Sequence, residues 1–180
     1  MKGITLLGVM CLNMFLADIS TWGQSIEPPV QQWNKMLLEA IRNDLARPNV
    51  HARNLFHFST GQYALHMLTE GHNGTLADGN VSWPEVPEDL SSWVPGTNEY
   101  RDMMASYAFR FISLRYENSP GWVETLEDLE ANFNSTTGTT PNVILNNSTP
   151  AVYGFDVANA INSAYMNDGS NQANNCLLYT

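Results

Sequence analysis

The sequence predicts an all-α fold: an irregular bundle of about five helices joined by long loops. Apolar residues recur at helical spacing in one segment after another. Proline, glycine and asparagine lie between these segments, where helices end and begin. No segment shows a sustained alternation of β-branched residues, and no repeat of solenoid length is present.

The first 25 residues have the order of a secretory signal peptide. Lys2 precedes an apolar run over residues 4–16, and small and polar residues follow up to Gly23 and Ser25. The run is too short to cross a bilayer, which takes about 20 residues. We expect a signal peptide over residues 1–25, cleaved near Gly23 or Ser25. The remaining chain, 26–180, is then secreted or periplasmic and not bound to a membrane.

The charge balance argues against two classes of partner. The formal net charge is −10 at pH 7, and the few basic residues are scattered rather than gathered in a stripe. Such a surface attracts neither nucleic acid nor an acidic membrane. Cys176 is the one cysteine left after cleavage, so stability is expected to come from packing rather than from disulfides.

Two helices are predicted on either side of Arg47-Pro48. The first has one apolar face, formed by Val30, Trp33, Leu37, Ala40, Ile41 and Leu45. Pro48 ends it, because proline cannot continue the helix and disfavours helical geometry at Arg47. Asn49 is the expected cap of the second helix, which fades near Gly71. Its predicted apolar face consists of Ala52, Leu55, Phe56, Ser59, Tyr63 and Met67.

Residues 71–97 form a predicted long loop with many glycines and prolines. Trp83 and Trp93 are expected to anchor this loop to the helices, and the alternative is a stacking platform for a sugar or another ligand. Asn98 begins the third predicted helix. Its wide apolar face holds Tyr100, Met103, Met104, Tyr107, Ala108, Phe111, Ile112 and Arg115.

Two more helices are predicted after the third. Ser119-Pro120 is a start signal for a fourth helix along Val123, Leu126, Leu129 and Phe133. Its carboxylates are expected to form a solvated face, namely Glu124, Glu127, Asp128 and Glu130. Residues 134–149 are predicted to be a loop. Thr149-Pro150 then begins a fifth helix that ends at Asp168-Gly169 and is lined by Val152, Phe155, Ala158, Ile161, Ala164 and Tyr165.

The sequence contains no complete catalytic set, so we assign no catalytic, cofactor-binding or metal-binding residues. His51, His57, His66 and His72 lack the spacing that places two ligands on one helical turn. Arg53 and Arg110 lie close to apolar faces and are expected to form structural ion pairs; anion binding is the alternative. Their candidate partners are Asp44, Glu39 and Asp102.

Three stretches resemble one protein family in the same order. The first combines Trp33-Asn34, residues 38–44, Arg47-Pro48 and residues 51–57, and it is similar to the N-terminal helices of exported vanadium-dependent haloperoxidase-like proteins. Residues 105–110 with 115–121 resemble the family's next helix and turn. Residues 158–173 resemble a later helix with its Asp-Gly-Ser-Asn loop. The chain departs from the family at residues 64–66, where Asp-Ala is common, and at Cys176, where tyrosine is common.

The resemblance implies a large all-α enzyme related to the type 2 phosphatidic acid phosphatases. Such an enzyme binds vanadate and uses hydrogen peroxide to oxidise halide. In the family, vanadate is held by Lys with a following Arg-Pro, by Ser-Gly-His, and by an Arg and His motif, all C-terminal to the matched region. This chain has none of these motifs. Its Arg47-Pro48 has no suitably placed lysine upstream, and its Gly71-His72 follows Glu70.

We therefore expect the N-terminal helical scaffold of a secreted haloperoxidase-like enzyme, incomplete and inactive by itself, with no cofactor in this chain. Its partner would be the remaining C-terminal part of the same protein. The alternatives are a non-catalytic secreted helical module that binds through the 71–97 loop, and acid phosphatase activity in the same superfamily. The first hypothesis predicts exposed apolar faces. The binding module predicts a cooperative monomer.

Overall fold

The computed structural model describes residues 29–72 and 81–166. These ranges form six α-helices and one short 3-10 turn, and they contain no strand. The predicted all-α bundle is therefore confirmed. The predicted signal peptide, the predicted helix end at Asp168-Gly169, and Cys176 lie outside the described ranges.

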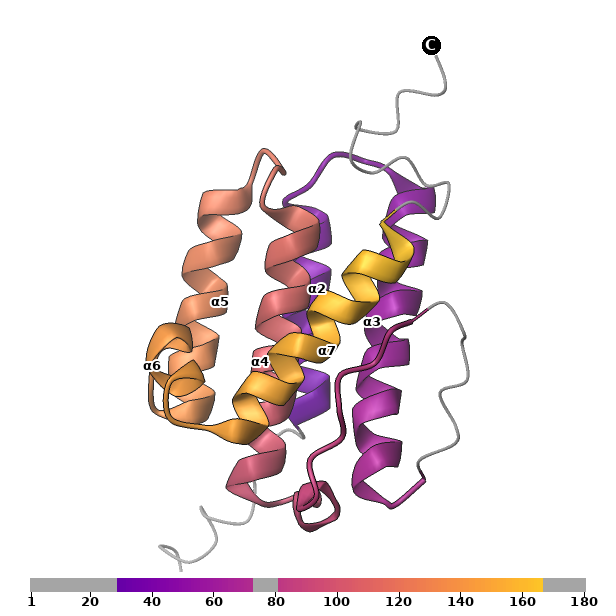
Figure 1. Ribbon diagram of the computed structural model, residues 1–180. Coiled ribbons are helices and arrows are strands. Elements are labelled where there is room, and N and C mark those ends of the chain that lie inside the picture. The colour runs from indigo at the N-terminus through magenta and orange to yellow at the C-terminus, as the bar shows by residue number, and fades with distance from the viewer. Residues whose placement is uncertain (1–28, 73–80, 167–180) are drawn as a thin grey trace, which may run out of the picture.

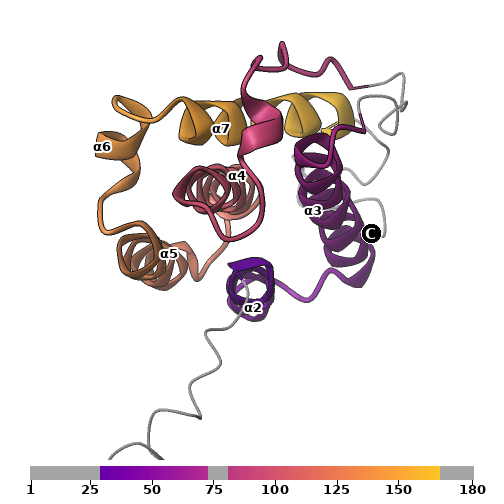
Figure 2. The same cartoon turned by 90° about the horizontal axis from the view of Figure 1, so that it is seen from below.

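Helix α4 lies in the middle of the bundle (Figures 1 and 2), with α2, α3, α5 and α7 arranged around it. The elements in chain order are α2 (Pro29–Arg42), α3 (Pro48–Thr69), η1 (Leu90–Ser92), α4 (Asn98–Tyr116), α5 (Trp122–Thr137), α6 (Pro141–Leu145) and α7 (Thr149–Tyr165). The prediction for α4 is confirmed in both its start and its face. Its buried side chains include every member of the predicted set, from Tyr100 through Arg115.

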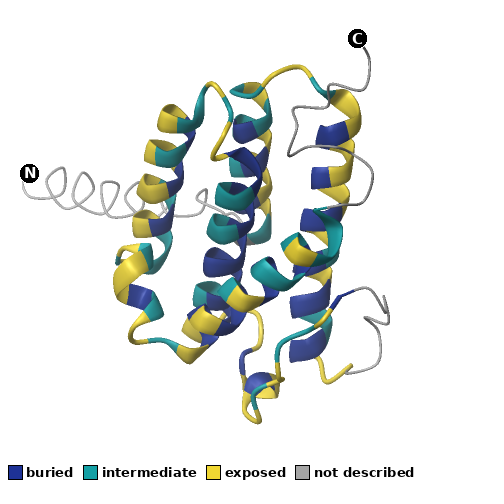
Figure 3. Cartoon of the chain, turned by 45° about the horizontal axis from the view of Figure 1, so that its top comes forward, coloured by how far each residue is buried: buried dark blue, intermediate teal, exposed yellow. Residues whose placement is uncertain are grey.

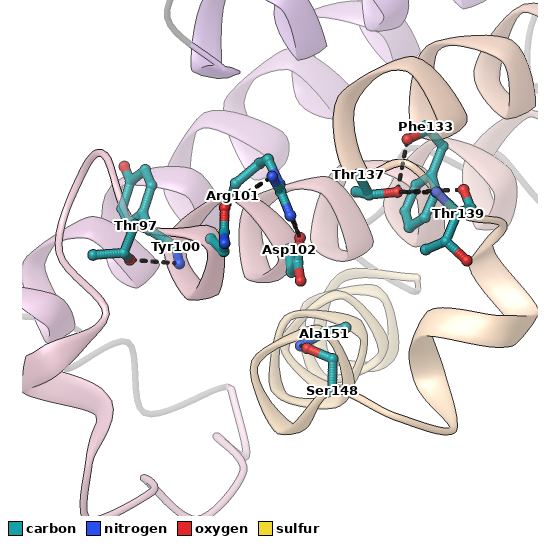
Figure 4. Close-up of polar contacts among 10 residues, drawn as sticks. Thr97, Tyr100, Arg101, Asp102, Phe133, Thr137, Thr139, Ser148 and Ala151 are labelled. Carbon is teal, nitrogen blue, oxygen red and sulfur yellow. Dashed lines mark hydrogen bonds and ion pairs between the residues drawn. The ribbon is translucent and has the colours of Figure 1, made fainter.

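Short side chains cap two of the helices (Figure 4). Thr97 Oγ1 accepts a hydrogen bond from the Tyr100 backbone N–H at 3.1 Å, and Ser148 Oγ accepts one from the Ala151 N–H at 3.3 Å. These bonds satisfy N–H groups that have no partner within the helix. Helix α7 thus begins at Thr149, and its cap is Ser148 rather than Thr149, one residue before the predicted cap.

Two predicted helix starts are wrong. Helix α3 begins at Pro48, so Asn49 already lies inside it, because proline is pre-shaped for the first helical position. Its cap is Arg47, whose backbone is non-helical as predicted (φ −123°, ψ 73°). Helix α5 begins at Trp122 after Gly121, and Ser119 belongs to the turn before it.

Residues 134–149 are not the loop that the sequence predicts. Helix α5 continues to Thr137 and ends at Gly138, which has a left-handed backbone (φ 74°). Thr140 and Pro141 then begin the short helix α6, which buries Ile144 against the bundle. Residues rich in Thr and Asn thus still form helix where a proline start and one apolar anchor are present.

The tryptophans anchor the connection between α3 and α4, as predicted. Trp93 is buried, its ring meets that of Tyr153 edge to face, and its indole N–H donates to Asp89 at 3.3 Å. Trp83 is partly buried against the core. The Trp93 ring is therefore not free to stack on a ligand.

Helix α3 buries a different face from the predicted one. Ala52, Leu55, Phe56, Ser59 and Tyr63 are all exposed, and Met67 is half-buried. The buried stripe instead contains Phe58, Gly61, Ala64, Leu65 and Leu68. Gly61 lies where α3 packs against α4 and α7. A Cβ at this position would overlap the Tyr107 hydroxyl and the Ile161 side chain, so a larger residue would require these side chains to shift.

Some smaller predictions of burial are also wrong. Helix α2 ends at Arg42, so Leu45 lies outside it and is 50% exposed. Val123 at the start of α5 is 69% exposed, and Val152 on α7 is exposed as well. Each of these residues lies at or near a helix end. The four carboxylates of α5 are exposed, as predicted.

Candidate functional site

A buried polar cluster lies where α2 ends and α3 begins. We call it the α2–α3 corner and define it as Asp44, Arg47, His51, Asn54 and Tyr116. The Asp44 carboxylate lies 2.5 Å from the Arg47 guanidinium, and their side chains are 0% and 12% exposed. At this depth each charge is compensated mainly by the other, because bulk water solvates neither of them.

His51 and Asn54 extend the corner along α3. The His51 Nε2–H donates to the Leu45 carbonyl at 2.8 Å, and Nε2 also lies 3.9 Å from Asp44. The His51 ring is stacked on Tyr116 with 6.3 Å between ring centroids. The Asn54 amide donates to the Tyr116 hydroxyl at 3.2 Å. The corner thus connects the α2–α3 turn to the last residue of α4.

The backbone of the turn after α4 closes over the same corner. The Gly121 N–H donates to the Asn43 carbonyl at 3.1 Å. A Cβ on Gly121 would lie 2.6 Å from that oxygen, so this approach requires glycine. The Asn43 amide also donates to Thr125 Oγ1 on α5 at 3.2 Å. In Figure 1 the α2–α3 and α4–α5 connections lie together at the top of the bundle.

Burial raises the pKa of Tyr116 to about 12, the hydrogen bond from Asn54 lowers it, and the Asp44 carboxylate adds a smaller upward contribution. Burial alone raises the pKa of Tyr153 to about 12. The folded chain therefore holds both phenols neutral at pH values where an unfolded chain would ionise them.

We expect the fold to lose stability as the pH rises from 10 towards 12. The raised pKa of Tyr116 means that its contribution is complete below its ordinary value of 10 and is lost on approach to about 12. Urea midpoints measured between these pH values should fall less steeply in Tyr116→Phe than in the unchanged chain. Equal slopes for the two proteins would contradict the assignment.

The α2–α3 corner is suited to fixing the fold rather than to chemistry. Its one carboxylate is neutralised by Arg47, and the Nε2 of its one histidine is bound to a carbonyl. Within residues 29–72 and 81–166, no three His, Cys, Asp or Glu side chains are placed to hold a metal ion. The rings of His57 and Tyr165 are stacked with 4.2 Å between their centroids. His66 stands further along α3 and lies near Tyr100 of α4.

The predicted ion pair of Arg110 needs correction. The proposed carboxylates pair with other arginines: Glu39 with Arg42, Asp44 with Arg47, and Asp102 with Arg101. Each pair is close in sequence, so little chain has to be ordered to form it. Arg110 instead donates to Asn159 on α7 at 2.8 Å and lies over the Phe155 ring at 4.6 Å. Arg53 is exposed on α3.

Two hollows lie outside the corner. One, of about 770 Å³, is open and is formed chiefly by α5 and α6, with Glu127 and Glu130 on its wall. The other, of about 320 Å³, is a mostly apolar groove. We call it the α3 groove, and it is lined by Val30, Ser59, Gln62, Tyr63, His66 and Tyr100. In the α3 groove the Tyr100 hydroxyl lies 3.4 Å from Nδ1 of His66.

The three stretches that resemble the haloperoxidase-like family contact one another. Asn54 and His51 from the first stretch contact Tyr116 from the second. Arg110 from the second bonds to Asn159 from the third. His57 from the first is stacked on Tyr165 from the third. Sequence segments separated by many residues are thus assembled into one continuous set of contacts.

No protein-family model matches the chain, and neither a curated protein nor a solved structure is significantly similar to it. Among the described helices, none combines the length and the apolar composition that crossing a membrane requires.

Proposed function

We propose that this chain is the N-terminal helical scaffold of an exported vanadium-dependent haloperoxidase-like protein. The whole protein would oxidise halide with hydrogen peroxide at a vanadate site in its C-terminal part, which is the partner of this scaffold. One observation carries the proposal. The three stretches that resemble the family pack against one another, through Asn54–Tyr116, Arg110–Asn159 and His57–Tyr165.

This packing supports a scaffold role because it explains the residues of the three stretches by their contacts with one another. The resembling residues include polar and aromatic side chains that are rarely buried without reason. Here they join α3, α4 and α7 through hydrogen bonds and stacked rings.

The described residues do not fit vanadate, so no reaction step is assigned to them. A vanadate site needs several cationic and N–H donors directed at one anion. Arg47 is committed to Asp44, and the Nε2 of His51 to the Leu45 carbonyl. The scaffold would therefore act by holding the shape of the protein while the C-terminal part supplies the oxyanion site.

Sequencing the coding region beyond Thr180 tests the proposal directly. We expect an open frame that encodes a lysine followed by Arg-Pro, and then Ser-Gly-His. Peptide mass spectrometry of the protein from its source should find both motifs in the same polypeptide as Trp33. A stop codon directly after Thr180 would exclude the proposal.

Activity measurements then separate the candidate functions. The 180-residue chain supplied with vanadate, peroxide and bromide should brominate no indicator, whereas the whole protein should do so and lose activity when vanadate is removed. Hydrolysis of p-nitrophenyl phosphate by the whole protein, without bromination, would instead favour acid phosphatase. Turnover by the 180-residue chain would contradict the scaffold role.

A further inference from the structure

The outer side of α3 carries a continuous stripe of uncovered apolar and small residues. Ala52, Phe56, Ser59 and Tyr63 follow one another at intervals of four, three and four residues, and all are exposed. Phe56 is 65% exposed and Tyr63 is 53% exposed. Figure 3 shows exposed residues along this helix as well as buried ones. Alternation of three and four residues is the spacing with which one helix packs along another.

The α3 groove lies beside this stripe. Four of its residues, Ser59, Gln62, Tyr63 and His66, stand at positions i, i+3, i+4 and i+7 of α3. Such a set of four forms the hole that receives one side chain from a facing helix. With a volume of about 320 Å³ and mostly apolar walls, the groove can take an aromatic ring.

Phe56 and the α3 groove lie on the same helix, so an antiparallel second copy of α3 can bring the Phe56 of each copy to the groove of the other. Phe56 precedes the midpoint between Ser59 and Thr60 by as many residues as Tyr63 follows it. An antiparallel second α3, related by a two-fold axis near this midpoint, would place its Phe56 at the level of the α3 groove. The same operation places Phe56 of the first copy at the groove of the second, so the surface is self-complementary.

The distribution of charge makes α3 the face at which two copies of this acidic chain repel each other least. Between Pro48 and Thr69, α3 contains no Asp or Glu, whereas α5 exposes Glu124, Glu127, Asp128 and Glu130. Figure 2 shows α3 and α5 on different sides of α4. Two copies that meet through α3 keep their acidic α5 helices far apart, so the net charge of −10 on each opposes this contact least.

We propose that the outer face of α3 is a two-fold interface between two copies of this chain, in which Phe56 of each copy enters the α3 groove of the other. The proposal is independent of the haloperoxidase-like assignment. A single pair of helices buries less than the 1,200 Å² or so of a stable interface, so the association belongs to the weak class. We expect a dimer that forms at micromolar concentrations.

Sedimentation equilibrium between about 1 and 200 μM tests the proposal, because a Kd in this range gives a mass that rises with concentration. Phe56→Asp and Tyr63→Asp should each weaken the dimer at least tenfold. Val123→Asp is the matched control: it places the same charge on an exposed apolar residue of α5, which is 69% exposed, and should leave the dimer intact. Circular dichroism checks that each variant is folded.

Disulfide cross-linking tests the position of the axis. In a chain whose natural cysteines are changed to serine, Ser59→Cys lies beside the two-fold axis and should form a cross-linked dimer under mild oxidation. Ser135→Cys on α5 should not. A chain that stays monomeric at 200 μM overturns the proposal, even where it binds an apolar dye. A dimer that survives Phe56→Asp overturns it too, because another surface then makes the contact.

Discussion

Replacing Gly154 by alanine is expected to lower the free energy of unfolding by about 3 kcal/mol, at the upper end of the usual cost of overpacking. Gly154 lies on the buried face of α7, directly against α4. A Cβ there would overlap the Met103 carbonyl oxygen and lie 2.9 Å from the carbonyl carbon. Because both atoms belong to a helix backbone, no side-chain rotation can relieve the overlap, and α4 and α7 must move apart.

Gly138→Ala is the control for this experiment. Gly138 has a left-handed backbone (φ 74°) but open space around its Cα, so its replacement should cost about 1 kcal/mol from backbone strain alone. Urea unfolding of both variants measures the difference. In an exposed helix interior, alanine would be more stable than glycine. A Gly154→Ala variant as stable as the unchanged chain would therefore show that α7 does not lie this close to α4.

Asp44→Asn is expected to lower the free energy of unfolding by about 3 kcal/mol, because a buried cation loses its counter-charge. The amide keeps the shape of the side chain but leaves the charge of Arg47 uncompensated in a position that is 12% exposed. Arg47→Met should also destabilise the chain, since it leaves Asp44 as the unpaired charge. The double variant should lose less than the sum of the two, by more than about 1 kcal/mol.

A second pair in the same region serves as the reference. Glu39 and Arg42 have the same i, i+3 spacing, but their side chains are 40% and 66% exposed. Glu39→Gln should therefore cost less than about 1 kcal/mol. If the two acid-to-amide variants were equally stable in urea, the buried ion pair of Asp44 and Arg47 would stabilise the fold no more than the exposed pair does.

The sequence predicted best where one interpretation of a segment was strongly preferred. In α4 the large apolar residues agree with a single helical register, and all predicted core positions from Tyr100 to Arg115 are buried. In α3 the apolar residues surround the helix, so periodicity alone allowed two stripes. The prediction uses the stripe that contains Phe56 and Tyr63, whereas the buried stripe contains Gly61, which lies against Tyr107 and Ile161.

The α2–α3 corner was predicted only in part, because its contacts cross long stretches of chain. Asp44 was recognised as a candidate partner for an arginine, but its true partner is three residues away. Asn54 and Tyr116 are 62 positions apart, and no local pattern links them. One signal was available: His51, Asn54, His57 and Gln62 place polar side chains along the face that α3 buries, and such residues usually mark buried hydrogen bonds.

The central position of α4 has a consequence for the way the chain is made. Helices α2 and α3 leave the ribosome first, yet the core that they pack against is formed largely by α4 and α7. Short helices without tertiary packing are marginal in water. The N-terminal pair would therefore wait in a partly ordered state until residues 98–165 have been synthesised. Fragments that stop before Tyr116 would lack the residue that joins the α2–α3 turn to the rest of the bundle.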